Sequence, residues 1–280
     1  MNLLQILLLA VVQGAAELLP VSSSAHVIVA EKLMGLDPTS PQMTLLLVML
    51  HTGTMFAVIA YFWTSWRATY FSSAAAFRTN ALHVVLATAV TGAVGLVLLK
   101  ILKRVIAGNS PGFEIEQLFG NARLMAAALA AAGILIIVSA KFRERGAGTL
   151  SLRGAACIGA IQGLCLPFRG FSRSGATIST GLILGVARRR AEEFSFALAV
   201  VLTPAVILRE AYRLYKTEAA AAADGAGLWQ LAAPSLLGMV LSFLAGLLAL
   251  RWLSRWLEQG HWHWFGIYCL AASLVVLWVG

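Results

Sequence analysis

The sequence predicts an all-α polytopic membrane protein, with six transmembrane helices and two re-entrant helical hairpins in an inverted-topology repeat. Three observations support this fold class. The 280 residues are 60% hydrophobic and only 12% charged, with a mean hydropathy of +0.83, a composition typical of chains that cross a bilayer several times. Several apolar segments have the length of a membrane span. Two longer apolar stretches are interrupted near their middle by proline and serine residues.

Six segments are long and apolar enough to cross the membrane as single helices. At about 1.5 Å per residue, roughly 20 residues reach across a hydrocarbon core of ~30 Å. The predicted spans are 42–63, 81–101, 121–140, 194–212, 231–250 and 262–279.

The remaining apolar stretches, 3–34 and 150–186, are too long for one span and too interrupted for two. Pro20 divides the first, and residues 167–170 divide the second, so that each arm is shorter than a full crossing. Interrupted backbone is tolerated at membrane depth only where protein or a water-filled cavity surrounds it. We therefore expect each stretch to be a re-entrant hairpin, which enters and leaves on the same side.

The two halves of the chain follow one plan, a hairpin and then three spans. Residues 1–140 form the first predicted repeat and residues 141–280 the second, within a single integral membrane domain. Because three is odd and a hairpin does not change sides, the second repeat begins on the opposite face, which makes the repeat inverted. Both hairpins also carry Gln-Gly in their first arm, at Gln13 and Gln162.

The net charge of +9 favours contact with anionic membrane lipids, and no nucleic-acid partner is expected because the chain has no soluble basic domain. Loops 64–80, 141–153, 188–190 and 251–261 share one side and carry the larger share of lysine and arginine. The positive-inside rule therefore predicts that this side is cytoplasmic and that both termini lie outside. The three cysteines lie in apolar runs without paired spacing, which predicts neither a disulfide framework nor a zinc site.

Charged side chains inside the interrupted stretches are the first candidates for function. Gln13 and Glu17 are four residues apart and share one helix face. A carboxylate within a membrane costs at least ~2.5 kcal/mol, so Glu17 is a functional candidate by default, and Arg173 in the other hairpin is its natural opposite charge. The alternative is a purely structural ion pair that holds the two hairpins together.

Hydroxyl groups cluster after each interruption, where the returning arms begin. Ser22 and Ser172 are predicted N-caps, and two helix N-termini directed at one point beside an arginine favour a phosphate. The predicted catalytic residues are Glu17 as metal ligand or base, Ser23 as nucleophile, His26 as proton carrier and Arg173 as phosphate clamp, a set that suits phosphoryl transfer to water. His51 either lines this site or packs as a polar core residue. The predicted substrate-binding residues are Gln13, Ser22, Ser24, Ser172, Ser174 and Thr177.

These motifs, Gln13 and Glu17 with PVSSSAH at 20–26 and GFSRSGAT at 170–177, resemble those of the undecaprenyl-diphosphate phosphatase family associated with bacitracin resistance. The resemblance extends over the whole chain, with Ala25 where glycine is usual and Arg169 where proline is common. It implies a bacterial inner-membrane enzyme, with its site open to the periplasm, that removes the terminal phosphate of a polyprenyl diphosphate lipid, undecaprenyl diphosphate. The product is the lipid carrier of cell-wall synthesis. The resemblance also implies a divalent cation, Mg²⁺ or Ca²⁺, with Glu17 and Gln13 as its predicted ligands.

Several alternatives stay open at this point. A flippase or transporter of the polyprenyl phosphate carrier also fits inverted repeats and broken helices, although the serine, histidine and arginine set favours an enzyme. The type-2 phosphatidic acid phosphatase class is rejected, because it requires a later histidine followed by a nearby aspartate, and no aspartate follows His261, the next histidine after Arg173. The nucleophile is either Ser23 or a water activated by His26. The oligomeric state is undetermined, with a homodimer as one option.

Overall fold

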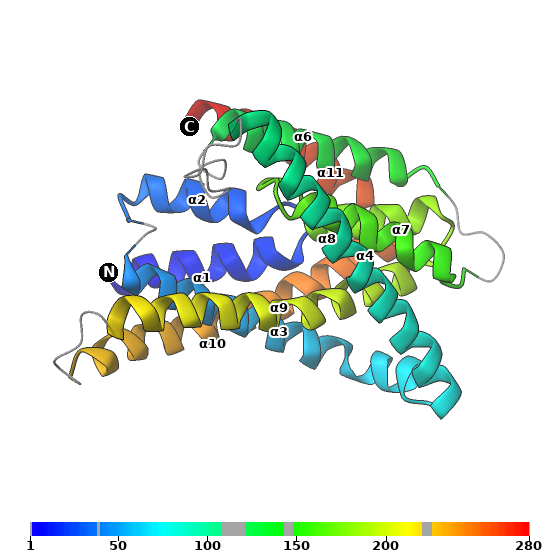
Figure 1. Ribbon diagram of the computed structural model, residues 1–280, viewed down its shortest axis with the longest axis horizontal. Coiled ribbons are helices and arrows are strands. Elements are labelled where there is room, and N and C mark those ends of the chain that lie inside the picture. The colour runs from blue at the N-terminus through cyan, green and yellow to red at the C-terminus, as the bar shows by residue number, and fades with distance from the viewer. Residues whose placement is uncertain (1, 38–39, 108–120, 143–147, 220–225, 280) are drawn as a thin grey trace.

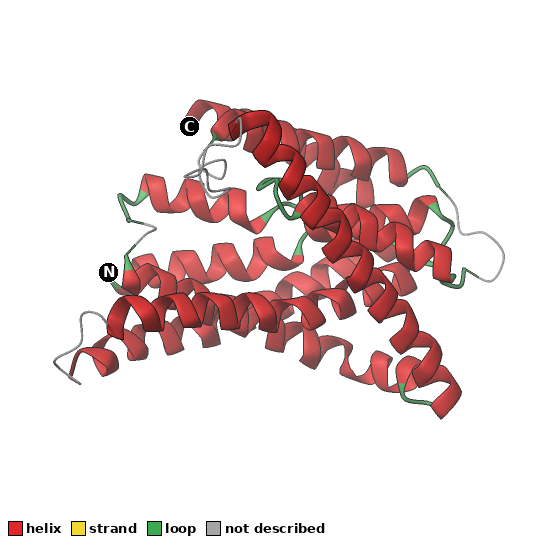
Figure 2. Cartoon of the chain, viewed as in Figure 1, coloured by secondary structure: helices red, strands yellow, loops and turns green. Residues whose placement is uncertain are grey.

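The computed structural model describes residues 2–37, 40–107, 121–142, 148–219 and 226–279. Within these ranges all regular structure is helical, as Figure 1 and Figure 2 show, which confirms the all-α class. The helices are α1 (Leu3–Leu18), α2 (Ser23–Leu33), α3 (Pro41–Tyr70), α4 (Ala74–Ala107), α6 (Ala122–Ser139), α7 (Leu152–Cys165), α8 (Arg173–Ile183), α9 (Arg188–Ala219), α10 (Ala226–Glu258) and α11 (Trp262–Val279).

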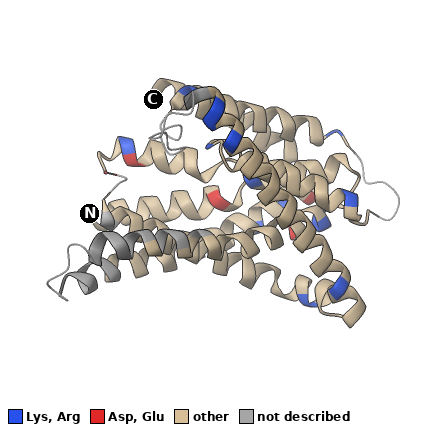
Figure 3. Ribbon diagram, in the orientation of Figure 1, with Lys and Arg blue, Asp and Glu red and all other residues tan. Residues whose placement is uncertain are grey.

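Five helices, α3, α4, α6, α10 and α11, are long and apolar enough to cross a membrane, and they contain five of the six predicted spans. Large apolar side chains on these helices are exposed, among them Val85, Leu248 and Trp278, whereas a water-soluble surface rarely carries so many. Most of the length of the helices carries no charged residue (Figure 3). The chain is therefore a multi-pass membrane protein. The sixth predicted span, 194–212, lies within α9, which is not among the apolar candidate spans of the described residues.

The first predicted hairpin is a pair of short helices, α1 and α2, joined by a tight turn. Asn2 caps α1, because its side chain accepts from the backbone N–H of Gln5 while the Gln5 side chain accepts from that of Asn2. The helix ends at Leu18, since Pro20 lacks an N–H group and cannot continue it. Ser22 then adopts a φ of 68°, in the left-handed region that non-glycine residues rarely occupy. The chain reverses direction there and begins α2.

The second predicted hairpin, α7 and α8, is built from equivalent local signals. The Ser151 side chain caps α7 by accepting from the Gly154 N–H at 3.1 Å. Pro167 follows shortly after the end of α7, and Gly170 turns the chain with a φ of 101°. A Cβ atom on Gly170 would lie 2.3 Å from the Met125 carbonyl oxygen, so this position requires glycine for its conformation and for its space.

The two helix pairs approach each other from opposite ends of the molecule, and their turns meet near its middle (Figure 1). The pair α1 and α2 packs on α10, α3 and α11, whereas α7 and α8 pack on α4, α6 and α9. Glycine allows the closest contacts in both pairs. A Cβ atom on Gly14 would lie 2.7 Å from the Ser242 carbonyl oxygen of α10, and one on Gly163 would lie 2.8 Å from the Thr91 carbonyl oxygen of α4. The Gln-Gly dipeptides seen in the sequence therefore mark the helix contacts that hold each pair in place.

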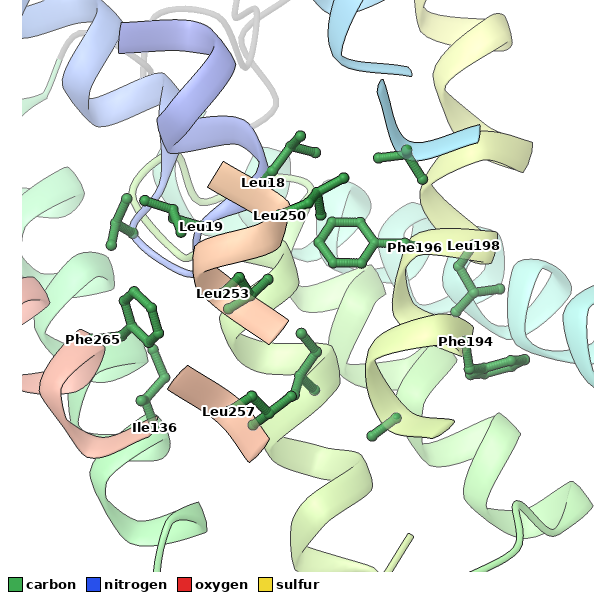
Figure 4. Packing of buried hydrophobic residues seen from close by; sticks show 14 of the residues in the cluster. Leu18, Leu19, Ile136, Phe194, Phe196, Leu198, Leu250, Leu253, Leu257 and Phe265 are labelled. Carbon is green, nitrogen blue, oxygen red and sulfur yellow. The ribbon is translucent and has the colours of Figure 1, made fainter. Parts of the chain in front are cut away.

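A continuous apolar core surrounds the meeting point of the two turns. Leu18 and Leu19 from the first turn join a cluster that also contains Phe196 of α9, Leu250 of α10 and Ile136 of α6 (Figure 4). These side chains are at most 7% exposed. Because dense packing resists displacement, this core holds the polar ends of α1, α2 and α8 in one arrangement.

Replacing Gly14 with alanine is expected to destabilise the fold by about 1–3 kcal/mol, because the added methyl group overpacks the contact between α1 and α10. The apparent melting midpoint of the purified protein in detergent measures this effect. Gly92→Ala is the matched control on α4, where a Cβ atom would have nothing within 4 Å. An equal midpoint for Gly14→Ala and the wild type would contradict the prediction.

Candidate active site

The site lies where the two turns meet, and its centre is an ion pair between the two helix pairs. Arg173 Nη2 donates to Glu17 Oε1 at 3.1 Å. Next to this pair the Ser174 hydroxyl donates to the Leu19 carbonyl oxygen at 3.1 Å. Residues separated by more than 150 positions in the sequence are thus joined by two hydrogen bonds. The predicted pairing of Glu17 with Arg173 is confirmed.

The Glu17 carboxylate is the hub of the polar contacts. Its Oε2 atom accepts from the Ser23 hydroxyl at 2.6 Å and from Gln13 Nε2 at 3.2 Å. His51 of α3 approaches the same oxygen, with Nε2 at 3.8 Å. Charge-assisted hydrogen bonds of this length are strong, so Ser23 is held with its proton directed at a carboxylate. Glu17, rather than a histidine, is the group placed to accept that proton.

Both returning helices direct their N-terminal ends into this region. The Ser172 side chain caps α8 by accepting from the Gly175 N–H at 3.2 Å, which confirms one predicted N-cap. Ser22 occupies the N-cap position of α2, but its side chain makes no capping hydrogen bond and instead lies 3.3 Å from the Ser24 hydroxyl. The first N–H groups of a helix carry a partial positive charge. Two such ends beside a guanidinium give the site a strong preference for anions.

A cavity of about 280 Å³ opens beside these groups. The predicted residues Glu17, Ser22, Ser23 and Ser24 line it, together with Ser172, Arg173 and Ser174, and its apolar wall comes largely from α7, α9 and the turn before α8. Arg173 Nη1 is buried and has no hydrogen-bond partner among the described residues, and the same is true of Gln162 Oε1 on the cavity wall. An unpaired guanidinium N–H is a strong donor that a bound phosphate oxygen would satisfy. The full lining is Ala16, Glu17, Ser22, Ser23, Ser24, His51, Gln162, Cys165, Leu166, Phe168, Arg169, Phe171, Ser172, Arg173, Ser174, Ala199, Leu202 and Thr203.

His26 does not take the position that the sequence suggested. Its Nδ1 atom lies 2.8 Å from the Ser22 carbonyl oxygen and its Nε2 atom lies 2.7 Å from the Tyr268 hydroxyl. The ring also stacks on Tyr268 of α11. Both ring nitrogens are therefore engaged, and His26, the predicted proton carrier, does not line the cavity that Glu17 and the serines share. Position 26 of α2 thus faces Tyr268 of α11.

Two further predicted substrate-binding residues, Gln13 and Thr177, contact residues of the site. Gln13 is 1% exposed and reaches only Glu17 among the site residues. Thr177 is completely buried, and its hydroxyl donates to the Arg173 carbonyl oxygen at 2.8 Å and contacts Ser195 of α9. Neither residue lines the cavity, so their observed contacts position Glu17 and the start of α8.

Helices α3 and α7 bring His51 and Gln162 to the cavity, two residues outside the predicted catalytic and substrate-binding sets. Gln162 is held by its Nε2 donation to the Thr91 hydroxyl oxygen at 3.1 Å, which turns its oxygen away from that partner. The sequence allows either a site role or a packing role for His51, and a histidine in the middle of a predicted span is a functional candidate by default. The presence of a histidine at position 51 is therefore a sequence signal for a functional role. What the sequence could not supply is the face of α3 that meets α1.

The described side chains of the site do not supply a full set of ligands for the predicted divalent cation. Among the described residues there is no group of three or more His, Cys, Asp or Glu side chains that could hold a metal ion. Glu17 is the one carboxylate in the described cavity lining, and Arg173 and Ser23 already contact its two oxygens. Gln13 presents a donor to it, not a ligand oxygen. This donor set does not fit a Mg²⁺ or Ca²⁺ ion held by protein groups alone, which would need several oxygen ligands.

The chain is similar to known proteins over nearly its whole length. Residues 6–275 match the family model described as bacitracin resistance protein BacA. "Undecaprenyl-diphosphatase 2" of Acinetobacter baylyi is 63% identical over 278 residues, which cover 99% of this chain and 98% of the relative. "Undecaprenyl-diphosphatase" of an Anaeromyxobacter species is 33% identical, with 100% and 90% covered. The protein of that name from Rhodopirellula baltica is 27% identical, with 99% and 97% covered.

Proposed function

The chain belongs to the bacitracin resistance protein BacA family, and on this premise we propose that it hydrolyses undecaprenyl diphosphate to undecaprenyl phosphate and inorganic phosphate. Relatives at 63% and 33% identity carry the name undecaprenyl-diphosphatase. The observation that carries the proposal is the 3.1 Å contact between Arg173 and Glu17, because it joins a phosphate-binding group to the carboxylate that holds Ser23. The reaction recycles the lipid carrier of cell-wall synthesis, and bacitracin resistance accompanies it.

Substrate binding follows from the charges around the cavity. Arg173 Nη1, which has no partner among the described residues, and the N-terminal N–H groups of α2 and α8 bind the terminal phosphate. Arginine presents several N–H donors in a planar fork that matches phosphate oxygens. The prenyl chain leaves the cavity along its apolar wall, which includes Leu166, Phe168 and Leu202, and continues into the surrounding lipid.

The first chemical step is the attack of Ser23 on the terminal phosphorus. The Ser23 Oγ–P bond forms, the bond between that phosphorus and the bridging oxygen breaks, and undecaprenyl phosphate leaves with the bond electrons. The hydroxyl proton passes to Glu17 Oε2, to which it already donates at 2.6 Å. Arg173 stabilises the charge on the phosphoryl oxygens in the transition state. The result is a phosphoseryl intermediate and a protonated Glu17.

The topology supports a site at membrane depth. Helices α1 and α7 contain 16 and 14 residues, or about 24 and 21 Å, which is short of a hydrocarbon core of ~30 Å. We therefore assign both helix pairs as re-entrant hairpins. The equivalent contacts of Gly14 with α10 and Gly163 with α4 support an inverted repeat of residues 1–140 and 141–280. The proposed location is the bacterial inner membrane, with the site open to the periplasm.

A divalent cation is proposed to arrive bound to the substrate. The diphosphate group supplies the oxygen ligands that the protein lacks, and Mg²⁺ commonly binds through substrate phosphates in this way. When bound, the ion would neutralise part of the diphosphate charge. Its requirement is tested by phosphate release with and without a chelator.

The experiment that tests the function is phosphate release by the purified protein in detergent, with undecaprenyl diphosphate as substrate. We expect cation-dependent release of one inorganic phosphate per lipid, and a ³²P-labelled terminal phosphate trapped on Ser23 by acid quench. Ser23→Ala is expected to release almost none, because it lacks the nucleophile. A flippase needs two compartments, whereas hydrolysis does not. Absence of release from the wild-type protein in detergent would reject the enzyme.

A further inference from the structure

The cavity lining contains a histidine that lies close to Glu17. His51 of α3 has its Nδ1 atom 2.8 Å from the Leu47 carbonyl oxygen. A carbonyl oxygen only accepts hydrogen bonds, so Nδ1 carries the hydrogen and, in the neutral ring, Nε2 has an available lone pair. Within the described part of the chain Nε2 makes no protein hydrogen bond. The side chain is 36% exposed and lines the cavity.

His51 lies close to the groups that react in the proposed first step. Nε2 lies 3.8 Å from Glu17 Oε2, the same oxygen that accepts from Ser23 at 2.6 Å. A separation of 3.8 Å is too long for a hydrogen bond. His51 therefore stands next to the catalytic carboxylate without being bonded to it, and its lone pair is open to a molecule in the cavity.

The proposed reaction needs a second base. When Ser23 attacks, its proton moves to Glu17, and a protonated carboxyl group cannot activate the water that must hydrolyse the phosphoseryl intermediate. His26 is not placed for this step, because its nitrogens contact the Ser22 carbonyl oxygen and the Tyr268 hydroxyl and it does not line the described cavity. His51 is the other histidine that the structure brings to these groups, and it is the one in the cavity lining.

We propose that His51 is the general base of the second half-reaction, an assignment that rests on the phosphatase function proposed above. Water attacks the phosphorus of phosphoseryl Ser23 and gives its proton to His51 Nε2. The new water oxygen–phosphorus bond forms as the Ser23 Oγ–P bond breaks, and the departing serine oxygen takes back the proton held by Glu17. Inorganic phosphate leaves, and His51 returns its proton to solvent. The two half-reactions thus use two different bases, Glu17 for the first and His51 for the second.

The test is rapid acid quench of the wild type and of His51→Gln in detergent, with undecaprenyl diphosphate carrying ³²P in its terminal phosphate. Glutamine keeps a polar side chain at this position but cannot accept a proton. We expect a stoichiometric burst of undecaprenyl phosphate, accumulation of label on Ser23, and steady-state phosphate release slower by about 10²-fold or more. His261→Gln is the matched control, since His261 is exposed and lies in the turn before α11, and it should turn over like the wild type.

A second variant distinguishes the loss of a catalytic base from a folding defect. His51→Ala leaves space in the cavity, and added imidazole is expected to restore phosphate release from its labelled intermediate, which a purely structural role would not allow. An unchanged steady-state rate in His51→Gln would overturn the assignment. Loss of the burst together with the steady state, without label on Ser23 and without imidazole rescue, would overturn it as well, because the defect would then precede the second step. If the wild-type protein releases no phosphate, the proposed function fails, and the His51 assignment fails with it.

Discussion

Arg173→Ala is expected to lower kcat/KM for phosphate release by about 10³- to 10⁵-fold, the range found when an arginine that stabilises a phosphoryl-transfer transition state is absent. The side chain donates to Glu17 with Nη2 and has a second buried nitrogen, Nη1, free for the substrate among the described residues. Removing it takes away the phosphate clamp and leaves the Glu17 carboxylate without its opposite charge. Steady-state phosphate release from undecaprenyl diphosphate measures the effect.

Two comparisons separate the charge of Arg173 from its shape. Arg173→Lys keeps the positive charge but loses the planar fork, so we expect activity between those of the wild type and the alanine variant. Arg153→Ala is the control for removing one arginine, because Arg153 is exposed near the start of α7 and does not line the cavity. If Arg173→Ala kept more than a tenth of the wild-type activity, Arg173 would not be the phosphate clamp.

Glu17→Gln is expected to slow formation of the phosphoserine by about 10²- to 10⁴-fold, the usual contribution of a positioned general base. The amide retains an oxygen that can accept from the Ser23 hydroxyl, but it cannot take the proton. Undecaprenyl phosphate should then appear without a burst, in contrast to the expectation for His51→Gln. Rapid-quench measurement of the first turnover gives the rate directly.

The control for this variant is Glu258→Gln, which removes a carboxyl group from the exposed end of α10 and should not change the rate. The double variant Glu17→Gln with Arg173→Ala gives a further check. Residues in direct contact are rarely additive, so the double variant should lose less activity than the product of the two single losses. Fully multiplicative losses would indicate that the two side chains act independently.

Much of the fold could be predicted because its causes are local in the sequence. Hydropathy located α3, α4, α6, α10 and α11, and the proline residues located the interruptions of both hairpins. The pairing of Glu17 with Arg173 was also predictable, since an isolated charge inside a membrane needs an opposite charge.

The rest depends on geometry that local patterns do not contain. Ser22 adopts a positive φ just before α2, and no residue type indicates such a turn at a serine. Position 26 then faces Tyr268 of α11, which depends on how α2 packs. His51 reaches Glu17 because one face of α3 packs against α1, which depends on the rotation of both helices. Thr177 is buried because α8 packs on α9 through Ser195. Each of these outcomes is decided by packing between distant segments.

The N-cap positions of α2 and α8 determine which residue begins each of these two helices. Ser22 and Ser172 stand at the same place before two helices of 11 residues each, so the first helical residue is Ser23 in one half and Arg173 in the other. The proposed nucleophile and the proposed phosphate clamp thus occupy equivalent backbone positions, each being the first residue of the second helix in its pair. Two identical half-length chains assembled about a twofold axis would place two serines there, or two arginines, and neither pair could both attack a phosphorus atom and neutralise its oxygens. Joining the halves in one polypeptide allows a different residue type at each of these two equivalent positions.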